Sequence, residues 1–72
     1  MNILLLVNQF CKHNDFFPTT LYGTKNRIII EYSSSKRREY NKLTTAICNS
    51  KVFRNVRTTF DPINNRILVR GK

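Results

Sequence analysis

The sequence of 72 residues has few of the residue types from which catalytic and metal sites are usually built. It contains four acidic residues, one histidine, two cysteines, two glycines and no tryptophan. The glycines are isolated, so there is no glycine-rich loop for a phosphate, and neither cysteine belongs to a CxxC pair. Cys11, His13, Asp15 and Cys48 together would offer four metal ligands, but the C-x-H spacing matches no common zinc pattern. We therefore expect no metal, no cofactor, no small-molecule substrate and no enzymatic activity.

Long apolar runs are also missing. The longest run at the start of the chain, Ile3 to Val7, has five residues and is followed by Asn8 and Gln9. It is too short for a transmembrane helix or a signal peptide, so we interpret it as a buried first strand and expect no membrane partner. With two cysteines and no sign of secretion, two reduced thiols are favoured over a disulfide, although the sequence leaves their pairing open.

Positive charge is the most prominent property of the chain. Thirteen lysines and arginines face four acids, which gives a net charge of +9 and a pI of about 10.3. So short a chain buries only a small core. Repulsion among its positive charges opposes compaction unless a polyanion binds. Nucleic acid is the commonest polyanionic partner. Residues 1–26 have a net charge of +1 and residues 27–72 a net charge of +8. We predict an apolar, aromatic N-terminal extension over 1–26 and a basic RNA-binding body over 27–72.

The pattern of apolar residues predicts a small all-β fold. Residues 8–26 show no period and are expected to be irregular. Residues 27–32 (RIIIEY) predict a strand, because isoleucine favours the pleated sheet. Residues 39–48 fit a helical face through Tyr40, Leu43 and Ile47, but their threonines favour a strand, which we prefer. Residues 52–60 and 66–70 predict a hairpin around Asp61-Pro62 and Asn64-Asn65. The expected fold is a three-stranded antiparallel sheet, like a zinc ribbon without metal, with an irregular N-terminal extension.

Basic residues of the second half are the candidate RNA-binding residues. Arginine suits phosphate because its planar guanidinium can donate two hydrogen bonds at once. Tyr32 and Tyr40 flank the first basic cluster and are candidates for base stacking. No base-reading motif is present, so we expect recognition of the backbone and of folded shape. The ten predicted phosphate-binding residues are Lys36, Arg37, Arg38, Lys42, Lys51, Arg54, Arg57, Arg66, Arg70 and Lys72.

Residues 27–72 resemble the bacterial-type large-subunit ribosomal protein L-thirty-three family, especially its organellar members. The chain lacks the two CxxC pairs of zinc-binding members, so the similarity is to the zinc-free form. The resemblance implies a structural constituent of the ribosome that binds ribosomal RNA of the large subunit. The matching segments, in order, are Ile28-Ile29-Ile30, Ser33-Ser34, Lys36-Arg37-Arg38, Tyr40, Thr44-Thr45, Arg54 to Phe60, Phe60-Asp61-Pro62 and Ile67-Leu68-Val69.

The expected partners are therefore ribosomal RNA and neighbouring ribosomal proteins. The many Asn, Lys, Ile, Phe and Tyr residues suggest an AT-rich coding genome, which favours a mitochondrial or other organellar ribosome. A cytoplasmic ribosome is an alternative location. A small viral or phage protein that binds nucleic acid or inhibits a host is the alternative function, and size alone would also allow a toxin or antitoxin component.

Overall fold

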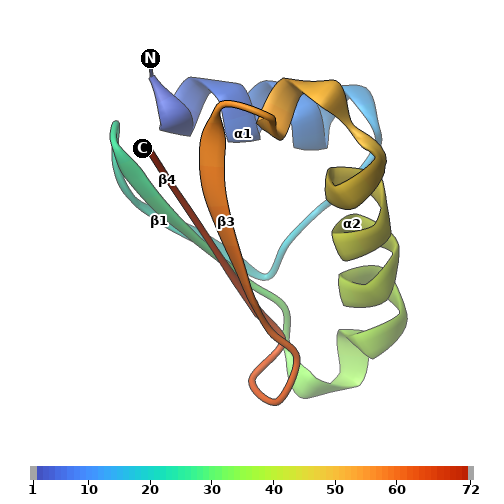
Figure 1. Ribbon diagram of the computed structural model, residues 1–72. Helices are drawn as coiled ribbons and strands as arrows, with labels where there is room; N and C mark the ends of the chain where they lie inside the picture. Colours follow the sequence, from blue (N-terminus) through green and yellow to red (C-terminus); the bar gives the residue numbers. More distant parts are fainter. Residues whose placement is uncertain (1, 72) are drawn as a thin grey trace.

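The computed structural model of the protein describes residues 2–71, which form two α-helices packed on one face of a four-stranded antiparallel sheet (Figure 1). The predicted three-stranded all-β fold with an irregular N-terminal extension is therefore wrong, and the chain is a small mixed α/β domain. The helices and strands, in chain order, are α1 (Ile3–His13), β1 (Thr20–Thr24), β2 (Arg27–Glu31), α2 (Arg37–Asn49), β3 (Val56–Asp61) and β4 (Arg66–Gly71), with short 3₁₀ helices η1 (Ser34–Lys36) and η2 (Lys51–Phe53) on either side of α2.

The order of strands in the sheet is β1-β2-β4-β3. Each half of the chain contributes a helix followed by a hairpin, and the two hairpins meet where β2 pairs with β4. The residues that were expected to form a separate extension thus supply α1 and an edge strand of the same sheet. Figure 1 shows α1 lying across one end of the helical layer and α2 running along the sheet.

The N-terminal apolar run begins α1 and is not the predicted strand. Ile3, Val7 and Cys11 recur every four residues and are all buried, which is the pattern of a helix with one face on the core. The Asn2 side chain caps the helix by accepting a hydrogen bond of 3.1 Å from the backbone N–H of Leu5. Five consecutive apolar residues fit a strand and a helix equally well, and the period becomes visible only when Cys11 is included.

The ambiguous segment that we predicted to be a strand is the helix α2. Tyr40, Leu43 and Ile47 are its buried residues, so the i, i+3, i+7 spacing was the correct signal. Thr44 and Thr45 turn their hydroxyls back onto the carbonyl of Asn41, at 2.8 and 3.0 Å. Their preference for strands is worth a fraction of a kcal/mol each, and burial of one apolar stripe outweighs it.

The strands predicted at β2 and β4 are confirmed, as is the hairpin of β3 and β4. The strand predicted over 52–60 is confirmed only from Val56 onward, because Val52 and Phe53 belong to the 3₁₀ helix η2. The side chains of the strands alternate between the two faces of the sheet. Ile28 and Ile30 of β2 and Ile67 and Val69 of β4 are at most 1% exposed and form the core beneath the helices. The intervening residues of each strand point to the opposite face, which we call the open face because no helix covers it (Figure 1).

A hydrogen-bond network joins the start of α2 to the turn between β3 and β4. Asn65 is buried with a positive φ of 50°, and its side chain accepts from Arg37 at 2.8 Å and donates to the Ser33 carbonyl at 3.2 Å. Its own carbonyl accepts from the Tyr32 N–H at 3.0 Å. Arg37 also donates to the Pro62 carbonyl. We call this set of contacts the Asn65 clamp, and it fixes α2 relative to the C-terminal hairpin.

Candidate nucleic-acid interface

The register of the four strands arranges the open face in three rows that run across the sheet. Neighbouring strands lie about 4.8 Å apart, and successive rows on one face lie about 6.7 Å apart. The partners at each position follow directly from the antiparallel pairing. The rows, each read from β1 to β3, are Thr24-Arg27-Arg70-Arg57, Tyr22-Ile29-Leu68-Thr59 and Thr20-Glu31-Arg66-Asp61.

The first row places three exposed arginines side by side, and we call it the arginine row. Arg27 pairs with Arg70, and Arg70 pairs with Arg57, so the three Cα atoms span about 10 Å across β2, β4 and β3. Within residues 2–71 none of the three forms an ion pair with an acidic side chain. Like charges directly opposite one another destabilise a sheet. An anion that bound across the row would relieve this repulsion.

The third row is electrically compensated. Arg66 lies between Glu31 and Asp61, and its Nε is 3.6 Å from the Glu31 carboxylate. Hydrogen bonds from the side chain and backbone of Asn64 lower the pKa of Asp61, so its carboxylate remains ionised at neutral pH. Charge on the open face is therefore polarised: the acids are confined to one end and the uncompensated arginines occupy the other.

The middle row is apolar and lies between the two charged rows. Tyr22 on the edge strand is 46% exposed, and Ile29 and Leu68 are half-buried beside it. The neighbouring Glu31 carboxylate raises the pKa of Tyr22, mainly through a hydrogen bond, so the tyrosine is a neutral hydroxyl. A depression of about 250 Å³ on this face is lined by Arg27, Ile29, Thr59, Asp61, Arg66 and Leu68.

A second group of basic residues lies on the helical side of the molecule. Lys36, Arg38 and Lys42 are exposed, and Arg38 and Lys42 are one helical turn apart on α2. Because Tyr40, Leu43 and Ile47 face the core, Arg38 and Lys42 lie on the side of α2 that is turned away from the sheet, and Lys36 ends the preceding 3₁₀ helix η1. We call Lys36, Arg38 and Lys42 the α2 basic face. A shallow groove on it is lined by Arg37, Arg38, Asn41, Lys42, Thr45 and Ala46.

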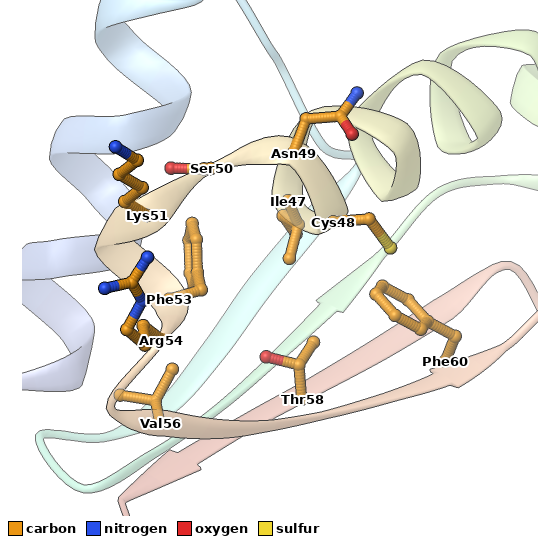
Figure 2. Close-up of a pocket in the computed structure, with 10 residues that line it drawn as sticks. All are labelled: Ile47, Cys48, Asn49, Ser50, Lys51, Phe53, Arg54, Val56, Thr58 and Phe60. Carbon is orange, nitrogen blue, oxygen red and sulfur yellow. The ribbon is translucent and has the colours of Figure 1, made fainter.

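Lys51 and Arg54 belong to a third region, at the rim of a groove between the end of α2 and strand β3. Figure 2 shows Phe60 of β3 and Cys48 of α2 facing one another across this groove, and Lys51 and Arg54 at its opposite end. The groove has a volume of about 480 Å³. The predicted phosphate-binding residues are thus distributed over three surfaces, and only Arg57, Arg66 and Arg70 share the open face. Lys72 lies outside the described residues.

Three of the predicted site residues have structural roles. Arg37 donates hydrogen bonds within the Asn65 clamp, and its guanidinium carbon lies 5.5 Å from the centre of the Tyr40 ring. Tyr32 and Tyr40 are 4% and 2% exposed and contact each other edge to face. The Tyr40 hydroxyl donates to the Arg66 carbonyl at 3.0 Å. Because both rings are in the core, neither presents a face on which a base could stack.

Two residues of the open face were absent from the sequence prediction. Arg27 was counted in the net charge but not placed in any cluster, because its neighbours in the row, Arg57 and Arg70, are distant in sequence. The alternation of Arg27, Ile29 and Glu31 along the strand was a usable signal for a face with polar ends. Tyr22 was missed because residues 8–26 were expected to be irregular.

The two cysteines are reduced and lie in different environments: Cys11 is buried and Cys48 is exposed. Burial raises the pKa of Cys11 to about 11, so at pH 8 only about one molecule in a thousand carries its thiolate. We predict that Ellman's reagent labels one thiol rapidly in the native protein, and the second only after unfolding. Cys48→Ser should abolish the rapid phase. Equal fast rates for both thiols would contradict the packing of α1 against the sheet.

Within residues 2–71, no three His, Cys, Asp or Glu side chains lie close enough to hold a metal ion. The same part of the chain has no helix with the length and apolar character needed to cross a membrane. Comparison of the chain with known protein families, with curated proteins and with solved structures gives no match.

Proposed function

We propose that the protein is a non-enzymatic nucleic-acid-binding protein whose open sheet face holds a phosphate backbone. The observation that supports this most strongly is the arginine row: Arg27, Arg70 and Arg57 in register, exposed, and without an acidic residue in the row. Guanidinium groups bind phosphate by bidentate, charge-assisted hydrogen bonds. A net charge of +9 adds long-range attraction to any polyanion.

The form of the open face favours backbone contacts over base reading. The face presents side chains in straight rows, whereas readers of the major groove insert a helix or a two-stranded ribbon. Arginine and a half-buried apolar strip suit phosphates and sugars, which position a protein without specifying sequence. Folded RNA is recognised largely in this way, through its shape and its backbone.

The narrower form of the proposal is a structural constituent of the ribosome that binds large-subunit ribosomal RNA, in a mitochondrial or other organellar ribosome. Small size and high positive charge support it. The similarity to the L-thirty-three family adds little, because the sheet here has four strands and two helices cover it. A viral or phage nucleic-acid-binding protein is the alternative, and the arginine row would serve it equally well.

Sucrose-gradient sedimentation of extracts that contain the protein tests the narrower form. We expect the protein to migrate with the large ribosomal subunit at about 0.15 M salt and to leave it as the salt concentration rises, since phosphate contacts are lost with counterion competition. Migration with another RNA-containing particle would refute the ribosomal role. Migration at the top of the gradient at low salt, unchanged by ribonuclease, would refute nucleic-acid binding altogether.

A further inference from the structure

Two of the basic surfaces of this protein face in opposite directions. The arginine row lies on the open face of the sheet, and the α2 basic face lies on the outer side of the helical layer (Figure 1). Between them is the hydrophobic core, which Leu43 of α2 and Ile67 of β4 fill with no exposed surface. A single flat partner therefore cannot contact both surfaces.

From this arrangement we propose that the protein bridges two nucleic-acid helices, one bound to the arginine row and one bound to the α2 basic face. The proposal rests on the proposed function, because it assigns a second surface to the same kind of ligand. The protein would then have a further activity, because it holds two nucleic-acid helices, of the same or of different molecules, at a fixed separation.

The dimensions of the molecule support two independent sites. The Cα atoms extend over 32 × 21 × 18 Å, so even the shortest dimension exceeds the Debye length of about 8 Å at physiological salt. A backbone bound at one surface therefore leaves the charges of the other surface largely uncompensated. A duplex has a persistence length of about 150 base pairs, so it cannot wrap around a body of this size to reach both surfaces.

Each surface also has the chemistry that a phosphate backbone requires. The arginine row offers three guanidinium groups. The α2 basic face offers Arg38 and Lys42 one helical turn apart, with the side-chain amide of Asn41 in the same groove. Lys36 lines a pocket that Lys42 also lines. Glu39, the one acidic residue of α2, lines this neighbouring pocket together with Asp15, Lys36 and Lys42. The two acids thus lie on the Lys36 side, whereas the groove beside Arg38 and Lys42 is lined by no acidic residue.

A capture assay with two duplexes tests the bridge. A biotin-labelled RNA duplex of about 20 base pairs is fixed to a surface, the full-length protein is bound, and excess protein is washed away. A fluorescent second duplex is then added, and its retention is measured. We expect wild-type protein to retain the second duplex, and the retention to disappear when the bound protein is removed with salt.

Two triple variants with the same change in charge identify the surfaces. One is Arg27→Gln/Arg57→Gln/Arg70→Gln and the other is Lys36→Gln/Arg38→Gln/Lys42→Gln, and each lowers the net charge by three. Protein concentration is adjusted so that every variant loads the first duplex to the same density, and circular dichroism verifies that each one is folded. We expect both variants to bind the first duplex and to retain the second at least tenfold less than wild type.

The other outcomes separate the bridge from the function on which it rests. If wild-type protein binds the first duplex but never retains the second, the bridge is refuted and the proposed function stands. If one triple variant retains the second duplex as wild type does, bridging does not use both surfaces, and a dimer that uses one surface is indicated instead. If wild-type protein binds no duplex at low salt, the proposed function itself fails.

Discussion

Replacing Arg27, Arg57 and Arg70 by glutamine should weaken binding to an RNA duplex on the order of a hundredfold at 0.15 M salt. Each phosphate contact contributes about 0.9 to the magnitude of the slope of log K against log salt. With equal affinities of the variant and the wild type at 1 M salt, the loss of three contacts lowers the affinity of the variant roughly a hundredfold at 0.15 M. Glutamine keeps the length and polarity of the side chains, and all three positions are exposed, so the fold should be retained. Fluorescence anisotropy of a labelled duplex measures the change.

Strand β4 offers a matched control for this experiment. Arg66 and Arg70 lie on the same strand and the same face, and each substitution by glutamine removes one positive charge. Arg70 belongs to the arginine row, whereas Arg66 is compensated by Glu31 and Asp61. We expect Arg70→Gln to weaken binding about fivefold and Arg66→Gln less than twofold. Equal losses would mean that net charge alone governs binding, and that the arginine row is no site.

Asn65→Ala should destabilise the protein by about 2–4 kcal/mol. The substitution removes the hydrogen bonds to Arg37 and to the Ser33 carbonyl, one of which involves a charged group. It also puts alanine at a φ of 50°, a left-handed conformation that asparagine tolerates and alanine does not. In a domain of this size the loss lowers the melting temperature by roughly 10–25 °C. Thermal unfolding followed by circular dichroism measures it.

Two further substitutions in the same turn separate the causes. Asn65→Gly loses the same side-chain hydrogen bonds but accepts the positive φ, so it should be less harmful than Asn65→Ala. Asn64→Ala affects an exposed residue outside the Asn65 clamp and removes one solvent-exposed hydrogen bond to the Asp61 carboxylate, so it should cost no more than about 1 kcal/mol. If Asn65→Ala were as mild as Asn64→Ala, the clamp would not fix α2 to the hairpin as described.

The sequence predicted the strands more accurately than the helices, for a physical reason. The β3–β4 hairpin carries its own signals: Asp61-Pro62 starts the turn, Asn65 takes the left-handed conformation, and Ile67 and Val69 alternate with Leu68. Helix α1 begins with a continuous apolar run that has no visible period. In α2 the threonines favoured a strand, and the buried stripe of the helix decided the conformation.

The site was predicted only in part, because the grouping of its residues depends on the strand register. Arg57 and Arg70 were chosen from sequence for their charge, but their placement beside Arg27 follows only from the insertion of β4 between β2 and β3. Composition likewise could not show that Arg37 is engaged in the Asn65 clamp. Composition also could not show that the arginine row and the α2 basic face lie on opposite surfaces, because that conclusion depends on α2 being a helix.

The salt dependence of duplex binding is the most direct test of the central claim that the arginine row binds phosphates. Affinities of the wild-type protein and of Arg27→Gln/Arg57→Gln/Arg70→Gln for one RNA duplex are measured from about 0.05 to 0.3 M salt. The account predicts that the triple variant has a slope of log K against log salt that is smaller in magnitude by about 2 to 3. Slopes that coincide within error would show that these three arginines contact no phosphate, and would contradict it.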